Sequence, residues 1–284
     1  MILPSIVSYG HTLETGADKL GTLLDSSSVA NDVEELRTRL ERDGYLYLKG
    51  YLDKDKINKA HDALLNQLNG ATGFKPEIAN KCTEVQEVLY SGRLVEFYEK
   101  LFGEPIRHYD YTWLRVIGPG KGTNPHCDLP YMGRGTHRHM TCWVPYKSTS
   151  YQLGGLMMLE GSHKRMDLLE NYVYRDVDSY CENKERDVRK VEKGEWTFSG
   201  TLSHNPIAIR NKFGGRWLVT EFEPGDFLTF GMFTVHASLD NQTKDQIRIS
   251  SDSRYQRASE PIDERWVGAN PPAHGPNGKR GLIC

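Results

Sequence analysis

The stretch RWLVTEFEPGDFLTF, residues 216–230, shows the pattern that decides the fold of this 284-residue chain. Two short runs rich in aromatic and apolar residues, 216–222 and 227–230, flank a Pro-Gly-Asp sequence that is typical of a turn. Comparable extended runs occur at residues 108–117, 139–147, 156–160 and 247–255. Many short strands without helices between them favour an antiparallel sandwich or barrel. We therefore expect a mainly β fold of the jelly-roll kind.

The chain before these strands has a helical pattern. Asn31 followed by Glu34 resembles a helix capping box, and apolar residues then recur at helical spacing as far as Gly44. The sequence Tyr-Leu-Tyr-Leu comes next and predicts a strand. Two more helices are expected, one ending at residues 69–70 and one covering residues 84–102. The jelly roll should therefore be flanked by N-terminal helices.

The length of the chain is compatible with one domain over residues 1–284. We expect a mostly helical N-terminal part at residues 1–104 and a jelly-roll core at residues 105–260, with a long insertion at residues 162–215 within that core. An irregular tail would cover residues 261–284. An insertion this long is usually a lid or a binding loop, and a helix on the surface is the alternative. From Gly268 onward the chain is rich in Pro and Gly, and we expect this end of the tail to be peripheral.

Charge and cysteine content disfavour several classes of protein. The 36 Lys and Arg residues nearly balance the 38 Asp and Glu residues, and no basic stripe stands out, so nucleic acid and membrane surfaces are not expected partners. The five cysteines form no Cys-Xaa-Xaa-Cys pair, which favours a reduced, intracellular protein. No apolar run approaches the roughly 18 residues of a membrane helix, and the apolar start is too short for a signal peptide. We expect a cytoplasmic protein; the sequence carries no signal for its oligomeric state.

The sequence His126-Cys127-Asp128 carries the strongest chemical signal. In an extended strand, residues two apart point to the same side, so the imidazole and the carboxylate could bind one metal ion. His236, far along the chain, could supply a second imidazole. Two His and one carboxylate form a facial triad that suits non-haem Fe(II), because three adjacent coordination positions stay open. We therefore expect a metal site at which a reaction takes place.

Arg248 lies on the expected strand 247–255, where Ser250, Asp252 and Arg254 share its face. In a simple two-sheet core this polar face would be exposed to solvent. In a barrel that holds a ligand it would line the pocket, where a guanidinium group can bind a carboxylate through two hydrogen bonds. The residues alone leave both alternatives open.

Several motifs, taken in order, resemble the phytanoyl-CoA hydroxylase-like family of Fe(II)/2-oxoglutarate-dependent dioxygenases. The resemblance runs from about Glu34 to about Tyr255. Its motifs are His126-Cys127-Asp128, Thr141-Cys142-Trp143, Gly154-Gly155-Leu156, Leu159-Glu160-Gly161-Ser162-His163-Lys164, Pro224-Gly225-Asp226, His236-Ala237-Ser238 and Arg248. Each motif is modest by itself, whereas their order and spacing together are specific.

The resemblance implies a double-stranded β-helix, which is a cupin-like jelly roll. It implies Fe(II) held by His126, Asp128 and His236, with 2-oxoglutarate and O2 as cosubstrates. The far carboxylate of 2-oxoglutarate would meet Arg248, assisted by Ser238. The family lines its cosubstrate pocket at three further positions, which here are Thr141, Trp143 and Trp113; the two tryptophans would serve equally well in core packing.

The implied activity is hydroxylation, or another oxidation of a C–H bond, of a small organic metabolite, coupled to decarboxylation of 2-oxoglutarate to succinate and CO2. The carboxylate at Asp128 argues against halogenation, because related halogenases have a small residue there. Cys127 departs from the family pattern, in which the namesake enzymes have Gln. The insertion 162–215 has no counterpart that aligns, so a CoA thioester is not implied as substrate.

Substrate contacts are expected in and near the insertion. The candidates are His204, Trp196 and Arg254, and a salt bridge at the end of the strand is the alternative role of Arg254. Two other classes of protein compete with the oxygenase: a non-redox metal-dependent jelly-roll enzyme, such as an isomerase or hydrolase, and a binding module with a vestigial metal site. Arg248 with Ser238 disfavours the first, and the complete triad disfavours the second.

Overall fold

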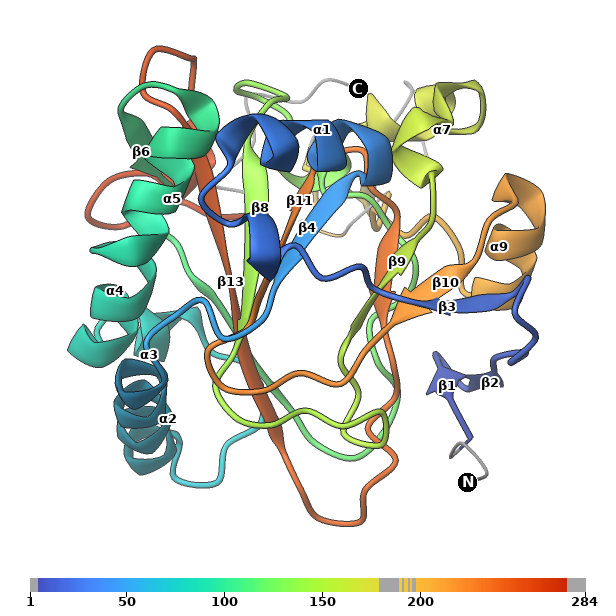
Figure 1. The fold of residues 1–284 in the computed structure, drawn as a ribbon, viewed down its shortest axis with the longest axis horizontal. Coiled ribbons are helices and arrows are strands. Elements are labelled where there is room, and N and C mark those ends of the chain that lie inside the picture. The colour runs from blue at the N-terminus through green and yellow to red at the C-terminus, as the bar shows by residue number, and fades with distance from the viewer. Residues whose placement is uncertain (1–4, 179–188, 191, 194, 196–197, 275–284) are drawn as a thin grey trace.

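Two β-sheets face each other in the computed structural model, which describes residues 5–178, 189–190, 192–193, 195 and 198–274 (Figure 1). The larger sheet has the order β4 (Tyr45–Leu48), β11 (Phe227–Gly231), β8 (Met140–Pro145), β13 (Arg248–Arg257), β7 (Trp113–Ile117) and β5 (Gly73–Phe74), with β6 (Ile106–His108) paired to β13. The smaller sheet has the order β12 (His236–Ser238), β9 (Leu156–Leu159), β10 (Trp217–Val219) and β3 (Leu20–Thr22). A separate pair joins β1 (Val7–Ser8) to β2 (His11–Thr12).

The chain passes repeatedly from one sheet to the other, which is the topology of a jelly roll. Strand β8 is in the larger sheet, β9 and β10 are in the smaller one, β11 returns to the larger one, and β12 and β13 alternate again. The stretch 216–230 therefore does not form a hairpin: its Pro-Gly-Asp turn carries the chain between the sheets. Only the β10–β3 pair is parallel among the described strands. The jelly-roll prediction is confirmed.

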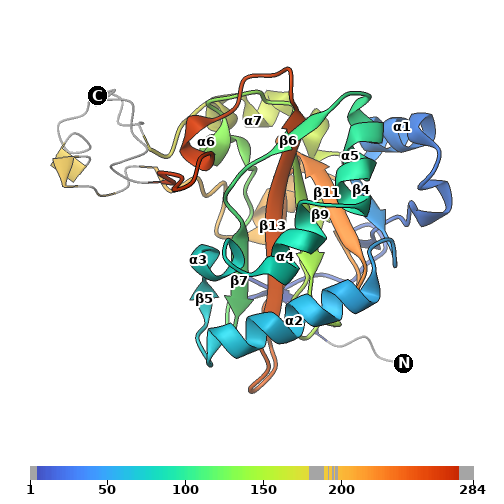
Figure 2. The same cartoon turned by 90° about the vertical axis from the view of Figure 1, so that its left-hand side faces the viewer.

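Helices cover the outer face of the larger sheet (Figure 2). They are α1 (Val33–Asp43), α2 (Lys54–Leu68), α3 (Pro76–Ala79), α4 (Thr83–Leu89) and α5 (Arg93–Phe102). Ile249 and Tyr255 of β13 belong to the apolar core beneath them, and the Tyr255 ring stacks on Tyr98 of α5 at 4.1 Å between centroids. The other face of β13 therefore points toward the smaller sheet. This placement decides between the two alternatives for Arg248: its polar face lies inside the barrel.

The structure corrects three local expectations. The N-cap of α1 is Asp32 rather than Asn31, because the Asp32 side chain accepts a hydrogen bond from the Glu35 backbone N–H. The helix expected over residues 84–102 is two helices, separated at Gly92, whose φ of 57° a helix does not allow. The run 108–117 is likewise interrupted between β6 and β7.

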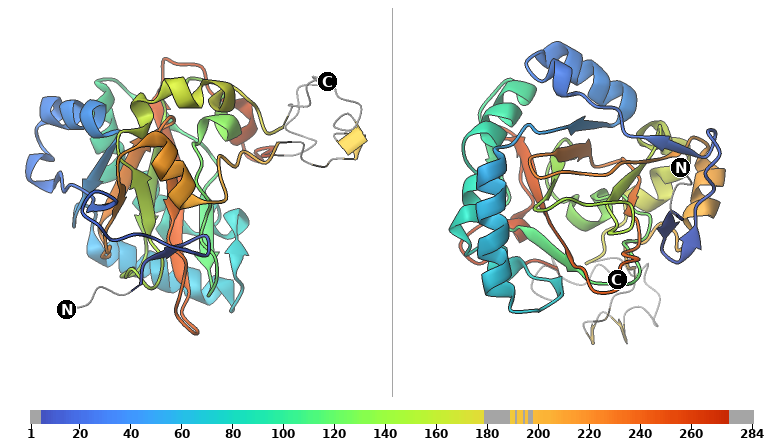
Figure 3. Two further views of the ribbon diagram at one scale, coloured as in Figure 1. Left: turned by 90° about the vertical axis from the view of Figure 1, so that its right-hand side faces the viewer. Right: turned by 60° about the horizontal axis from the view of Figure 1, so that its bottom comes forward.

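The insertion 162–215 contains the short helix η2 (Ser162–Lys164), α7 (Met166–Val173) and α9 (Pro206–Phe213). Helix α9 packs on the outer side of the smaller sheet through Ile209 and Phe213 (Figure 3). The described ends of the insertion thus contain surface helices, which was the alternative to the lid interpretation. Residues 179–188, at the centre of the insertion, lie outside the described part of the chain.

The expectation that the chain is peripheral from Gly268 onward is wrong at His274, and the part of the tail before it is also packed onto the barrel. Trp266, in the short helix η3 (Glu264–Trp266), is completely buried, and its ring packs at a tilt against Trp113, with 4.7 Å between ring centroids. His274 packs against the Trp266 ring and lines the central cavity described below. The physical reason is that the apolar surface of Trp266 is buried against the rings of Tyr109, Tyr111 and Trp113, which holds the segment in place.

Candidate metal centre and active-site cavity

His126, Asp128 and His236, which are far apart in the sequence, come together in the folded chain. Nε2 of His126 and Nε2 of His236 lie 3.7 and 3.6 Å from Oδ1 of Asp128. One donor atom from each residue lies within 4.8 Å of the others, and all three residues are buried. The three side chains that the sequence singled out are therefore close enough to hold one metal ion.

Backbone hydrogen bonds bring these residues together. His126 and His236 exchange two of them, each 3.0 Å long, so the loop before α6 (Leu129–Met132) is paired with the start of β12. Asp128 itself has helical angles, φ −78° and ψ −23°. The expectation of an extended strand through the whole triplet is thus wrong at Asp128. The carboxylate faces the imidazoles because the chain begins a helical turn there.

The protonation of both imidazoles fits a metal site. Nδ1 of His126 lies 2.8 Å from the Asn124 carbonyl oxygen, and Nδ1 of His236 lies 3.0 Å from that of Thr234. Because a carbonyl only accepts, each Nδ1 carries the proton and each Nε2 keeps its lone pair. Burial, with the neighbouring His236, lowers the pKa of His126 to about 3, and burial also lowers the pKa of His236. Both rings are neutral at pH 7, as metal ligation requires.

The two oxygens of Asp128 have different surroundings. Oδ2 accepts hydrogen bonds from Thr141 Oγ1 at 2.5 Å and from Arg254 Nη2 at 3.0 Å. Oδ1 is the atom that faces the imidazoles. Burial opposes ionisation, but the charge of Arg254 and the facing imidazoles hold the pKa of Asp128 below its ordinary value. Two neutral imidazoles and one ionised carboxylate oxygen are a donor set that suits ferrous iron.

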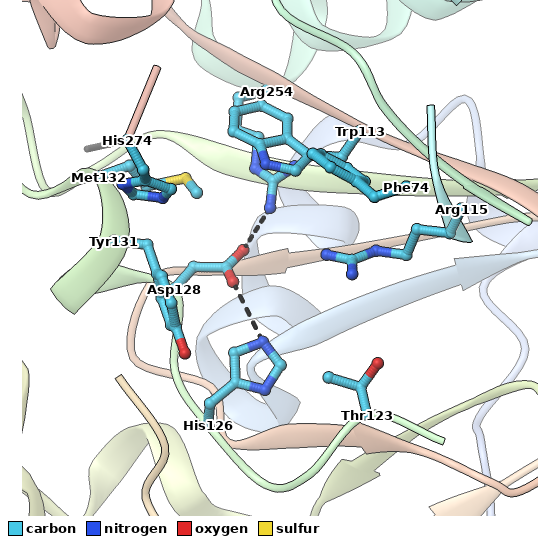
Figure 4. A pocket seen from close by; sticks show the side chains of 10 residues that line it. All are labelled: Phe74, Trp113, Arg115, Thr123, His126, Asp128, Tyr131, Met132, Arg254 and His274. Carbon is cyan, nitrogen blue, oxygen red and sulfur yellow. Dashed lines mark hydrogen bonds and ion pairs between the residues drawn. The ribbon is translucent and has the colours of Figure 1, made fainter. Parts of the chain in front are cut away.

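A cavity of about 200 Å³ opens beside this centre. It is lined by side chains from β5, β7, the loop before α6, α6, β13 and the tail (Figure 4). They are Phe74, Trp113, Arg115, Thr123, His126, Asp128, Tyr131, Met132, Arg254 and His274. Two of the three candidate metal ligands thus form part of the wall of a space that a small molecule can enter.

Arg248 and Ser238, the residues expected to bind the cosubstrate carboxylate, are both buried, and neither lines this cavity. Arg248 is 1% exposed, and its Nη1 donates to the Gly154 carbonyl oxygen. Its Nε has no hydrogen-bond partner among the described residues, and burial lowers its pKa to about 10. Ser238 follows His236 by two positions on β12, so the two side chains share a face about 6.6 Å apart. Among the described residues Arg248 forms no ion pair, so an anionic ligand could supply a partner for its buried charge.

The other predicted cosubstrate residues have different surroundings. Trp143 is fully buried against Phe222, and its Nε1 lacks a partner among the described residues. Trp113 lines the cavity and carries the Arg254 guanidinium over its ring at 4.1 Å. Thr141 contacts the candidate metal ligand Asp128. It therefore orients a ligand instead of lining the cavity.

The three residues expected to contact the substrate lie in different parts of the chain, and one of them lines the cavity. Arg254 forms the salt bridge to Asp128, the alternative role considered for it, and also lines the cavity. His204 is exposed, stacks on Tyr9 at 5.4 Å and does not line the cavity. Trp196 lies outside the described residues.

Sequence reasoning missed most of the cavity wall. Phe74 comes from a two-residue strand, and His274 comes from the irregular tail, so neither has a periodic signal. Arg115 could have been found, because it follows Trp113 by two positions on one strand and so shares its face.

A jelly roll with a two-His, one-carboxylate centre in its interior defines a class, the non-haem iron enzymes that use an open coordination site. The family model described as Phytanoyl-CoA dioxygenase (PhyH) matches residues 83–250, and this chain belongs to that family.

The comparisons support this placement. A 1-deoxypentalenic acid 11-beta-hydroxylase of Streptomyces exfoliatus is 26% identical over 268 residues, which cover 85% of this chain and 87% of the relative. Two solved structures share the fold, each with a TM-score of 0.60. The epimerase SnoN, in complex with Fe3+, alpha ketoglutarate and nogalamycin RO, is 18% identical and covers 86% of this chain and 94% of its own. EctD from S. alaskensis is 16% identical and covers 95% of both chains.

The protein is an Fe(II)- and 2-oxoglutarate-dependent dioxygenase, with O2 as the second cosubstrate, and it oxidises a small organic molecule. Within the described ranges, no helix has the length and apolar character that crossing a membrane would require.

Proposed function

We propose that this protein hydroxylates a C–H bond of a small natural-product metabolite, with His126, Asp128 and His236 as its iron ligands. Arg248, assisted by Ser238, holds the far carboxylate of 2-oxoglutarate. The relative that hydroxylates 1-deoxypentalenic acid supports the substrate class. The observation that carries the proposal is the arrangement of donors: each ligand has one atom bonded to protein and one atom facing the other ligands.

Bound iron with 2-oxoglutarate supplies oxidising chemistry in which R–H, 2-oxoglutarate and O2 become R–OH, succinate and CO2. The side chains of this protein prepare the site for it. The Asn124 and Thr234 carbonyls keep both imidazoles in the tautomer that leaves Nε2 free. Thr141 and Arg254 hold Asp128 by Oδ2, so one oxygen stays available. The apolar wall of Phe74, Trp113 and Met132 limits access of water.

The test is spectroscopic. Fe(II) and 2-oxoglutarate added without oxygen should give a weak charge-transfer absorption in the visible region, and zinc in place of iron should abolish it. The variant His236→Ala should lose the band. His204→Ala is the matched control, because it removes an exposed imidazole outside the cavity, and it should keep the band. A well-folded wild-type protein without the band would contradict the proposal.

A further inference from the structure

Arg115 places a second guanidinium group in the cavity, apart from the one that contacts Asp128. It lies on β7 opposite Ser250 of β13, and alternation along the strand directs its side chain to the inside of the barrel. Its Nε donates to Oδ2 of Asp252 at 2.6 Å. Figure 4 shows the end of the side chain pointing into the cavity, toward the side where Asp128 and His126 lie.

The two terminal nitrogens of Arg115 form no hydrogen bond with any residue in the described part of the chain. Among the described residues, the bond from Nε to Asp252 is its one hydrogen bond. The Phe74 ring lies 5.9 Å from Cζ and packs beside the guanidinium. The side chain keeps 28% of its surface exposed although Asp252 is buried. The guanidinium is thus held in place at Nε, while Nη1 and Nη2 can still donate. Two such parallel N–H groups can bind a carboxylate through two hydrogen bonds.

The charges inside the barrel also point to an anion. Among the described residues, three guanidinium groups, Arg115, Arg248 and Arg254, lie on the inner side of the larger sheet with two carboxylates, Asp128 and Asp252. Ferrous iron and the dianion of 2-oxoglutarate add no net charge. The guanidinium groups in this part of the barrel therefore outnumber the carboxylates by one, and the end of Arg115 borders the cavity. A substrate with a single negative charge would balance this difference.

The rest of the wall is apolar or aromatic. Phe74, Trp113, Tyr131 and Met132 surround the space next to the Arg115 guanidinium. A ligand that matches this wall has a hydrocarbon body and one charged end.

We propose that Arg115 binds the carboxylate of an organic-acid substrate and thereby selects small apolar acids and orients their hydrocarbon body toward the metal centre. This inference rests on the proposed function. Arg115 is a specificity-determining residue in this proposal, because it contacts the end of the substrate that does not react.

The experiment uses matched pairs of compounds. Rigid alicyclic and aromatic carboxylic acids, such as 1-adamantanecarboxylate, are each paired with their primary amide, which has the same shape and no charge. One CoA thioester of an acid in the panel is added as a further arm. Binding to the enzyme loaded anaerobically with Fe(II) and 2-oxoglutarate is measured by calorimetry and by the shift of the visible band. Succinate release is measured in oxygen.

We expect the acids that fit to bind roughly tenfold or more tightly than their amides, because each amide leaves the guanidinium without a charged partner. The CoA thioester, which lacks the free carboxylate, should not compete. Arg115→Gln should remove the preference for acids and leave the affinity for 2-oxoglutarate unchanged. Arg115→Lys, which keeps the charge without the fork, should restore part of the preference.

Arg42→Gln is the matched control, since it removes a guanidinium that is half-exposed on α1, outside the cavity. Equal behaviour of acids and amides in the wild type, whether all bind or none does, would overturn the inference. So would a loss of 2-oxoglutarate affinity in Arg115→Gln with the preference for acids intact, because Arg115 would then serve the cosubstrate. A wild type without the visible band would instead contradict the proposed function.

Discussion

Nη2 of Arg254 lies 3.0 Å from Oδ2 of Asp128, and the two side chains are only 2% and 4% exposed. This buried ion pair joins β13 of the larger sheet to the candidate metal ligand at the start of α6. The Arg254 guanidinium also lies over the Trp113 ring, so it is held from two sides. The pair binds the oxygen that does not face the imidazoles, and it therefore directs the other oxygen toward the metal position.

Replacing Arg254 by Leu should destabilise the protein by roughly 3–5 kcal/mol, because a buried carboxylate loses its charged partner. Chemical unfolding of the metal-free protein measures the change. Arg254→Lys should retain part of the stability, and iron should bind more weakly to both variants. An Arg254→Leu protein as stable as the wild type would show that Asp128 does not depend on this pair.

Replacing Arg248 by Ala should raise the 2-oxoglutarate concentration needed for the visible band far more than it alters iron binding. Loss of one partner of a buried charge pair costs about 2–5 kcal/mol, which corresponds to a dissociation constant at least roughly 25-fold higher. Titration of 2-oxoglutarate without oxygen measures it. If the variant bound 2-oxoglutarate with unchanged affinity, Arg248 would not be a cosubstrate-binding residue.

The metal-free protein should become less stable as the pH falls below about 6.5. Burial depresses the pKa of His126 to about 3 in the folded protein, while an unfolded imidazole titrates near its ordinary value. Protons therefore bind the unfolded chain preferentially between these values, and each pH unit costs up to about 1.4 kcal/mol per such group. Urea midpoints from pH 7.5 to pH 4.5 measure the slope.

His126→Gln should show a shallower slope in the same experiment, because the group that binds the proton on unfolding is gone. His61, a half-buried histidine on α2 outside the cavity, offers the matched control His61→Gln, which should keep the slope of the wild type. Parallel slopes for all three proteins would mean that His126 is not buried in its neutral form.

Trp266→Ala should destabilise the protein by about 3–5 kcal/mol and widen the cavity, because it removes a completely buried ring beside Trp113. Thermal unfolding measures the stability, and binding of larger acids measures the second effect. Tyr174→Ala, at a ring that is 63% exposed, is the control and should shift stability by at most about 0.5 kcal/mol. A Trp266→Ala protein with unchanged stability would show that burial of this ring does not hold the tail in place.

Local patterns predicted much of the fold. Gly44 and Asn69 end α1 and α2 in the left-handed conformation, as their positions after apolar repeats indicate. Short runs between turns predicted β8, β9, β10, β11 and β13 within a few residues. The prediction of one helix over residues 84–102 missed the break at Gly92, where the backbone takes a positive φ that glycine adopts easily and an α-helix does not.

By itself, the sequence determined the kinds of donor available, two imidazoles and a carboxylate, and which residues of β13 share a face. Both follow from residue identity and from the two-residue period of a strand, which are local properties. Only the tertiary structure decided that the polar face of β13 is inside, that a helical turn aims Asp128, and that Arg115 and His274 border one cavity. These depend on which distant segments bury their apolar surface together, and no local pattern carries that information.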